Sequence, residues 1–202
     1  MILLGVSGSI AAYKSVELLR LFLKAGQDVR VIMTQAATRF VGPLTFQALS
    51  GHPVLADSLD PQGWPPVPVR LDRRPSSINA SEGGQMAHLD LPEKASALVL
   101  APATAQLLSQ LACGAAGDIV SASILAMPRS PAGRLKAPVL IAPAMHEAMW
   151  LHPATRANVI TLKKFGYQFI GPERGPLGRA DDQGLGRMTD PKAIASIVLK
   201  AL

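Results

Sequence analysis

Two ionisable side chains follow a short apolar segment in the second half of the chain. Residues 139–142, V-L-I-A, predict a buried strand, and P-A-M-H-E-A-M-W follows at 143–150. We therefore expect His146 and Glu147 where this strand stops and a helix begins. In open α/β sheets, ligands bind beyond the carboxyl ends of the strands. An imidazole and a carboxylate at that position make this segment the first candidate for a ligand site.

A second candidate site is the turn G-V-S-G-S-I at residues 5–10, between an apolar strand and an amphipathic helix. Backbone N–H groups at the start of that helix, together with two serine hydroxyls, would bind a phosphate. The spacing is not G-x-G-x-x-G, so a mononucleotide is favoured over a dinucleotide. A tight turn with a serine N-cap explains the same residues about as well.

Two further residues have a structural interpretation beside a functional one. His88, in M-A-H-L-D-L, precedes a helix that we expect Pro92 to start, and a lone histidine there is more often structural or exposed. Thr104, in A-P-A-T-A-Q, follows a strand that Pro102 is expected to stop. Its hydroxyl can cap the next helix or bond a ligand. Met145 is more typical of core packing than of ligand contact, and the same holds for Met149.

The elements that must position these residues alternate along the chain, which predicts an α/β fold with a doubly wound parallel sheet. Residues 57–85 hold five prolines and no period, so they predict a long irregular flap. Residues 171–186, rich in glycine, predict a second irregular segment. Strands are predicted at 2–6, 29–33, 98–101, 139–142 and 167–170, and helices at 10–25, 36–40, 45–50, 104–113, 153–165 and 191–201.

Composition argues against several classes of protein. The 202 residues are 49% hydrophobic, as suits one domain with a buried sheet, yet no apolar run reaches the roughly 18 residues of a membrane span. A strand begins at once, so no signal peptide is expected. The charge of +6 accompanies only 4% aromatic residues and scattered basic ones, which favours a small anionic ligand over nucleic acid. Cys113, the only cysteine, is expected to be buried, and its solitude fits a reducing cytoplasm. No metal site is predicted.

Taken together, these segments resemble the homo-oligomeric flavin-containing cysteine decarboxylases, and most closely the members that act on phosphopantothenoylcysteine in coenzyme A synthesis. The resemblance implies a Rossmann-like flavoprotein domain over residues 1–202, with FMN as cofactor and a small anionic thiol as substrate. It also implies a cytoplasmic trimer, or a multiple of one. It rests on I-L-L-G-V-S-G-S-I-A-A-Y-K, V-I-M-T-Q-A-A-T-R-F-V-G-P-L-T-F-Q-A-L-S-G, M-A-H-L-D-L, A-P-A-T-A, P-A-M-x-x-x-M-W, and G-P-E-x-G with a later G-R-M.

The resemblance gives each candidate residue a role. His88 matches the active-site histidine, an acid and base suited to near-neutral pH. Oxidation of the substrate thiol by the flavin creates the electron sink that a cysteine carboxylate lacks. The segment 171–188 matches the substrate flap. The implied substrate contacts are His146, Met149 and Arg179, and the implied cofactor contacts are Gly8, Ser9, Ile10, Thr34, Thr104, Ala105, Gln106 and Ala144.

Three departures from the family pattern affect the substrate side. His146 replaces an asparagine that handles the substrate carboxylate, and A-Q-L at 105–107 replaces A-N-T. Ala180, in R-A-D-D, replaces a cysteine that donates the last proton, so decarboxylation is expected to stop at the unsaturated enethiol. Two alternatives therefore stay open. One is an FMN-binding protein that has lost decarboxylation and serves another redox or regulatory role, and the other is a subunit that only binds a partner enzyme.

Overall fold

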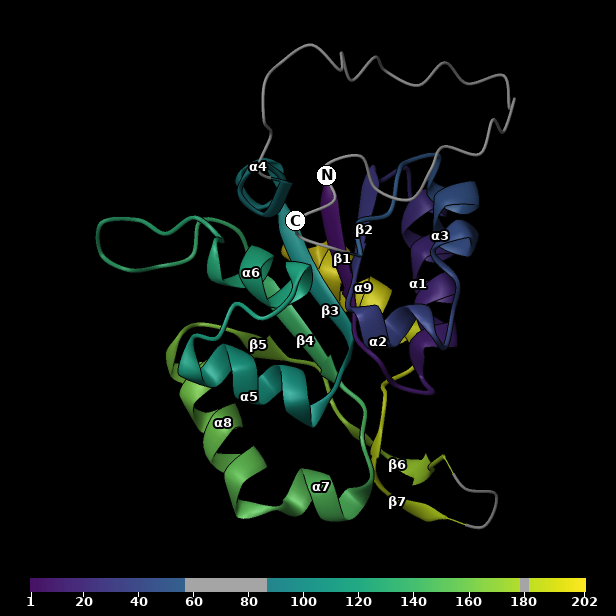
Figure 1. Cartoon of the computed structure of the whole chain (residues 1–202), viewed down its shortest axis with the longest axis vertical. Helices are drawn as coiled ribbons and strands as arrows, with labels where there is room; N and C mark the ends of the chain where they lie inside the picture. Colours follow the sequence, from purple (N-terminus) through teal and green to yellow (C-terminus); the bar gives the residue numbers. More distant parts are fainter. Residues whose placement is uncertain (57–86, 179–181) are drawn as a thin grey trace.

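Five short parallel strands form the centre of the molecule as a single sheet (Figure 1). The structure, a computed structural model, describes residues 1–56, 87–178 and 182–202. The flap predicted at 57–85 lies outside the described residues. The order across the sheet is β2-β1-β3-β4-β5. The strands are β1 (Ile2–Val6), β2 (Val29–Met33), β3 (Ala97–Ala103), β4 (Val139–Pro143) and β5 (Gln168–Phe169).

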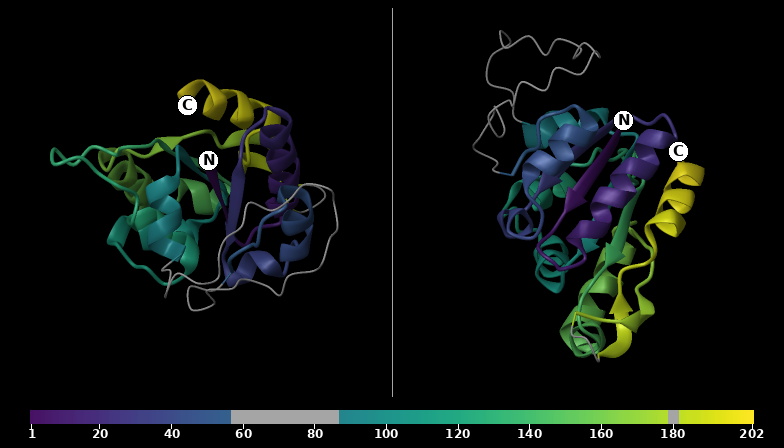
Figure 2. Two further views of the ribbon diagram at one scale, coloured as in Figure 1. Left: turned by 90° about the horizontal axis from the view of Figure 1, so that it is seen from above. Right: turned by 90° about the vertical axis from the view of Figure 1, so that its right-hand side faces the viewer.

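Helices cover both faces of the sheet, because successive side chains of a strand point to opposite sides. In β1, Ile2 and Leu4 pack with α1 (Ala12–Lys24) and α9 (Pro191–Ala201) in one apolar core. Leu3 belongs to the core on the other face, with α5 (Ala105–Cys113), α6 (Ile119–Leu125) and α8 (Pro153–Lys164). Figure 2 shows these layers edge-on. The predicted doubly wound α/β fold is confirmed.

The remaining helices are short, and most of them lie at the ends of the strands. At the top of Figure 1, α4 (Ala87–Lys94) lies beside the amino ends of the strands, and the N–H of Ser96 donates to the carbonyl of Met1 at 2.8 Å. At the bottom, α7 (Glu147–Leu151) follows the carboxyl end of β4. The others are α2 (Gln35–Thr38), at the end of β2, and α3 (Pro43–Ser50), which packs against α1 and β2. None of the described helices is both long and apolar enough to cross a membrane.

Two prolines do not have the effect predicted for them. Pro92 was expected to start a helix, but α4 begins at Ala87 and holds Pro92 inside it. In so short a helix, the missing N–H removes a single bond near the end. Pro102 was expected to stop a strand, but β3 continues to Ala103, and its register with β4 shifts between Leu100 and Ala103. A strand tolerates proline at such an irregularity.

A hairpin replaces the irregular segment predicted at 171–186. The strands β6 (Glu173–Pro176) and β7 (Gln183–Arg187) pair antiparallel and extend below the carboxyl ends of the sheet (Figure 1). An ordinary strand has alternating apolar residues, but these two strands have glycine and proline instead. The sequence pattern therefore did not predict the hairpin. The seven residues of α6 were also missed. That helix begins with a capping box formed by Asp118 and Ser121.

Candidate functional site

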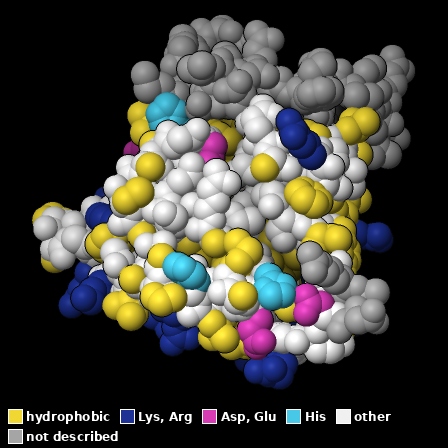
Figure 3. All heavy atoms as spheres, turned by 60° about the horizontal axis from the view of Figure 1, so that its bottom comes forward, with side chains coloured by type: hydrophobic (Ala, Val, Ile, Leu, Met, Phe, Trp, Pro, Cys, Tyr) yellow, Lys and Arg dark blue, Asp and Glu magenta, His cyan; other side chains and the backbone are white. Residues whose placement is uncertain are grey.

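A pocket of about 720 Å³ opens at the carboxyl ends of the strands. It brings together five of the predicted site residues: Ser9, Ile10, Ala144, His146 and Met149. The first two come from the turn between β1 and α1, and the others come from the segment between β4 and the end of α7. Figure 3 turns this end of the molecule toward the viewer, and histidine and carboxylate side chains lie beside one another on it. Two separate sequence motifs thus converge on one cavity.

The loops after β1 and β3 are joined by hydrogen bonds next to this pocket. The Ser7 hydroxyl donates to the carbonyl of Pro102 at 2.7 Å and accepts from the N–H of Thr104 at 3.1 Å. The chain passes from β1 to β2 on one side and returns to β3 on the other, so the strand order reverses between β1 and β3. Such a reversal opens the crevice where doubly wound proteins bind ligands, and FMN in flavodoxin-like sheets of this order.

Gly8 allows the β1 turn to lie closely against α2. A Cβ built on Gly8 would be 2.5 Å from the Cβ of Ala36, so a larger residue would push the turn away from that helix. Next to it, the Ser9 hydroxyl accepts from the N–H of Ala11 at 3.3 Å, and Ile10 is exposed. The turn is therefore tight, with its serine bonded to a backbone N–H, and it also leads into the start of α1, where a phosphate would bind. Both interpretations of this segment fit the observed geometry.

Thr34 and Thr104 act as helix caps at the same edge of the sheet. Thr34 Oγ1 accepts from the N–H of Ala37 at 3.2 Å, and Thr104 Oγ1 accepts from the N–H of Leu107 at 3.3 Å. Among the predicted cofactor contacts, those outside the lining of the 720 Å³ pocket are Gly8, Thr34, Thr104, Ala105 and Gln106. They lie where β1, β2 and β3 end, so they share the sheet edge with the pocket but not its wall.

Both ring nitrogens of His146 have protein partners. Nδ1 accepts from the N–H of Ala148 at 3.1 Å, which caps α7, and Nε2 lies 3.0 Å from Oδ2 of Asp182. An accepting Nδ1 assigns the proton of the neutral ring to Nε2, which then donates to the carboxylate. The sequence placed His146 at the substrate carboxylate. In this structure it connects the start of α7 to the hairpin.

Two cations of the pocket wall, Lys14 and Arg187, were not singled out from the sequence. Burial lowers the pKa of Lys14 from its ordinary 10.5, and the positive charge of Arg187 acts in the same direction. The Lys14 Nζ donates to the carbonyl of Met188 at 3.4 Å, and Arg187 Nη2 donates to Oε2 of Glu173 at 2.7 Å. Two positive groups lining one pocket favour an anionic ligand. The sequence held a signal for each of these cations: Lys14 is a lysine about one turn after S-G-S, and Arg187 is the arginine of the G-R-M segment.

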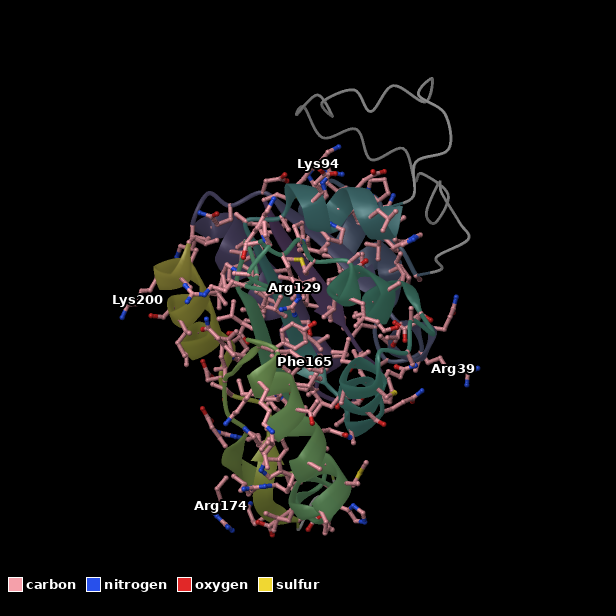
Figure 4. The ribbon with its side chains drawn as sticks, turned by 90° about the vertical axis from the view of Figure 1, so that its left-hand side faces the viewer. Arg39, Lys94, Arg129, Phe165, Arg174 and Lys200 are labelled. Carbon is pink, nitrogen blue, oxygen red and sulfur yellow. The ribbon has the colours of Figure 1, made fainter. Side chains whose placement is uncertain are left out.

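His88 is not brought to the pocket within one chain. It lies on α4, at the amino ends of the strands, whereas the pocket lies at their carboxyl ends (Figure 1). In Figure 4, Lys94 at the end of α4 and Arg174 in β6 are at opposite ends of the molecule. The buried Nδ1 of His88 has no hydrogen-bond partner among the described residues. A joint role of His88 and the pocket therefore requires more than one copy of the chain.

The structure also bears on several smaller expectations. Cys113 is exposed, so its predicted burial was wrong. It ends α5, whose buried face carries Leu107, Leu108 and Leu111 instead. Met145 and Met149 both line the pocket; Met149 is 50% exposed, and Met145 also packs partly against the core. Arg179 and Ala180 lie outside the described residues. Within the described ranges, no cluster of three or more His, Cys, Asp or Glu side chains could hold a metal ion.

Comparison with curated proteins finds relatives over almost the whole chain. A family model described as Flavoprotein matches residues 1–202. The coenzyme A biosynthesis bifunctional protein CoaBC of Mycobacterium tuberculosis (strain H37Rv) is 40% identical over 196 residues, 97% of this chain and 40% of that protein. CoaBC of Escherichia coli (strain K12) is 40% identical over 198 residues, 98% of this chain and 42% of that protein. The chain thus spans about two fifths of the length of these relatives.

Comparison with solved structures finds the same fold. A PPC decarboxylase variant complexed with pantothenoylaminoethenethiol is 27% identical, with a TM-score of 0.76 over 98% of this chain and 96% of the other. The FMN-binding protein AtHal3 is 27% identical, with a TM-score of 0.75 over 98% and 94%. The FMN-dependent cysteine decarboxylase SpaF is 29% identical, with a TM-score of 0.70 over 99% and 95%. The predicted Rossmann-like fold is confirmed.

Proposed function

We propose that this chain, which belongs to the Flavoprotein family, binds FMN at the carboxyl edge of its sheet and decarboxylates a cysteine carboxylate. The proposed reaction is the decarboxylation of phosphopantothenoylcysteine, the step that leads toward phosphopantetheine in coenzyme A synthesis, in the cytoplasm. The CoaBC relatives and the decarboxylases of similar fold support this reaction. The observation that carries the proposal is the meeting of the S-G-S turn and the P-A-M segment in one pocket.

The residues of this edge fit a mononucleotide. A volume of about 720 Å³ is in the range of small-molecule pockets. The backbone at Gly8, Ser9 and Ile10 would hold the phosphate at the start of α1, with the positive charge of Lys14 one turn further on. Thr34, Thr104, Ala105, Gln106 and Ala144 would border the rest of the cofactor. When bound, FMN supplies the oxidation of the thiol that prepares the carboxylate for loss of CO₂.

His88 would act as the base that takes a proton from the substrate thiol. Because α4 and the pocket lie at opposite ends of the sheet, we propose that His88 serves the pocket of a neighbouring subunit in a homotrimer or a multiple of one. The unpartnered Nδ1 among the described residues supports this. So do Leu89 and Leu125, which are 46% and 37% exposed on α4 and α6, two helices that pack together. A second subunit would cover both leucines.

The substrate would bind through its negative charges and its thiol-bearing chain. Lys14 and Arg187 give the pocket positive charge, and Met149 offers a polarisable, half-exposed side chain beside them. His146 would contribute only to the extent that its Nε2 leaves Asp182. We also propose Arg179 as a substrate contact, since a guanidinium suits carboxylate and phosphate.

The test uses purified protein and phosphopantothenoylcysteine. We expect a yellow protein that releases FMN on denaturation and that removes CO₂ from this substrate. Mass spectrometry should score the loss of CO₂ and the loss of two hydrogens separately, because Ala180 predicts the unsaturated enethiol as the product, with the two hydrogens passed to the flavin and from there to another acceptor. A colourless protein that binds no added FMN would sink the cofactor proposal. A flavin-loaded protein that leaves the substrate intact would sink the reaction alone.

A second function is favoured by one specific observation. His146 stands in place of the family's asparagine, and both of its ring nitrogens contact protein partners. Loss of the group that handles the substrate carboxylate is what we expect of a flavoprotein that has lost decarboxylation and serves another redox or regulatory role. Bound FMN without CO₂ release, in the experiment above, would select this alternative.

A further inference from the structure

The outer edge of β7 is bonded to the residues that lead into α7. The N–H of Met145 donates to the carbonyl of Gly186 at 3.0 Å. The N–H of Leu185, which faces away from β6, donates to Oε1 of Glu147 at 2.8 Å. An exposed strand edge leaves such groups without partners. Here one backbone amide and one side-chain carboxylate satisfy them.

The glycines of Q-G-L-G-R at 183–187 allow this close approach. A Cβ built on Gly184 would be 3.0 Å from the Cβ of Glu147, and one built on Gly186 would overlap the carbonyl oxygen of Met145. Gly184 and Gly186, which both face α7, therefore leave room for the start of that helix. The proposed chemistry gives these glycines no role of their own, so they indicate a specific contact between the two elements.

The bonded hairpin supplies one wall of the pocket. Pro176 ends β6 and lines the cavity, as do Leu177 and Gly178 after it and Asp182, which precedes β7. The opposite wall is the start of α1. Movement of the hairpin away from α7 would therefore change the shape of the cavity without touching the α1 side.

We infer that Glu147 is a positioning residue whose carboxylate holds the β6–β7 hairpin against α7 and thereby sets the substrate wall of the pocket. The inference rests on the proposed function for the identity of the substrate. Glu147 does not line the pocket, so it acts through the hairpin. A charged acceptor makes a stronger bond to an N–H than a neutral one does, and its removal leaves the partly buried Leu185 N–H without a partner.

The hydrogen bond to Leu185, rather than the ion pair with Arg174, is the effective contact. Arg174 Nη2 lies 3.3 Å from the same Oε1, but the arginine side chain is 73% exposed. Exposed ion pairs contribute little to stability. A glutamine at position 147 keeps an oxygen for the Leu185 N–H and loses only the charge. The two contacts can therefore be separated by substitution.

The test compares Glu147→Ala, Glu147→Gln and Arg174→Ala with the wild-type protein in its FMN-loaded form. Amide hydrogen exchange of the peptide that contains Leu185 should be faster by about tenfold or more in Glu147→Ala. Its KM should rise by about tenfold, the ratio that one lost hydrogen bond gives, with kcat within about twofold. Glu147→Gln should fall between wild type and Glu147→Ala in both measurements, because it keeps a weaker, neutral acceptor, and Arg174→Ala should stay within about twofold of wild type. FMN content and thermal melting check that each variant folds.

Three results would overturn the inference: unchanged Leu185 exchange in Glu147→Ala, faster exchange with an unchanged KM, or equal damage in Glu147→Gln and Glu147→Ala. If the wild-type protein does not decarboxylate the substrate at all, the proposed function fails. Exchange at Leu185 does not depend on turnover, so in that event it decides alone whether Glu147 holds the hairpin.

Discussion

At the scale of single residues, His146 shows why a site residue can be located from sequence while its contacts cannot. Its position after a buried strand predicted a place at the carboxyl edge, and the structure puts it in the pocket wall. Its partners are Ala148, two residues away, and Asp182, which belongs to a hairpin that the sequence pattern did not reveal. Strand ends are a local property of the chain, whereas the partner of a side chain depends on the folded arrangement.

His146 is predicted to carry two separable contributions. His146→Ala removes the cap of α7 and the contact with Asp182, and should lower the free energy of unfolding by about 1 kcal/mol in urea titrations. His146→Asn should recover most of that, because asparagine caps helices well. His152→Ala is the matched control, since His152 caps α8 in the same way, with Nδ1 3.2 Å from the N–H of Ala154. Only the His146 variants should speed amide exchange in the hairpin. Equally fast amide exchange of the hairpin in His152→Ala would contradict this assignment.

Tyr167 is predicted to titrate late. Burial raises the pKa of its phenol above the ordinary 10.0, and hydrogen bonding and charge from Arg129 offset only part of that rise. The unfolded chain would then ionise first as the pH passes 10, so the tyrosine's contribution to stability is complete below pH 10 and declines above it. Ultraviolet difference titration of wild type against Tyr167→Phe should assign the later ionisation to Tyr167. An ionisation at or below pH 10 would contradict the burial argument.

At the scale of elements, the central sheet was predictable and the hairpin was not. Buried parallel strands such as β4 are continuous apolar runs, and long helices such as α1 carry an apolar stripe, so both leave a strong local pattern. In β7 the positions that face α7 are glycines, because Met145 and Glu147 come too close for a side chain. Tertiary contact therefore removed the alternation by which a strand is recognised.

Gly186→Ala should separate the hairpin from α7. The added methyl group would overlap the Met145 carbonyl, and overpacking of this kind costs about 1–3 kcal/mol. We expect a lower melting temperature and faster exchange at Leu185, measured on FMN-loaded protein. Gly178→Ala is the matched control in the same hairpin, since its Cβ would meet Ile10 at an ordinary 3.8 Å and should move the melting temperature by only about 1 °C. A melting temperature in Gly186→Ala equal to the control would refute the close-contact explanation.

At the scale of the whole molecule, the chain holds its proposed base and its pocket at opposite ends of one sheet. The sequence placed His146 correctly after a strand, but it placed His88 before a helix, whereas His88 lies inside α4. Sequence pattern alone could not reveal that α4 lies at the amino ends and the pocket at the carboxyl ends. The topology of the fold shows this separation, so the role of His88 depends on whether the pocket is shared between subunits.

Mixing of two inactive variants should restore activity if a site is shared between subunits. His88→Asn keeps the flavin site and should lower turnover about a hundredfold or more. Gly8→Val should displace the β1 turn from α2 and lower FMN content. Oligomers reassembled from equal amounts of both should recover about a quarter of wild-type turnover, since random pairing joins an intact pocket to an intact His88 in about that share of sites. Light scattering should report a trimer or a multiple, and a stable monomer that retains activity would rule out the shared site.

The two walls of the pocket also come from distant parts of the sequence, and this has a consequence for synthesis of the protein. The turn at residues 5–10 leaves the ribosome early, whereas the opposing wall, drawn from residues 176–178 and 182–188, is made far later. Domains can begin to fold while translation continues. The pocket, however, is not complete until residue 188 has emerged. A truncated translation product would therefore contain every proposed cofactor contact, up to Ala144, and still lack the wall that the substrate needs.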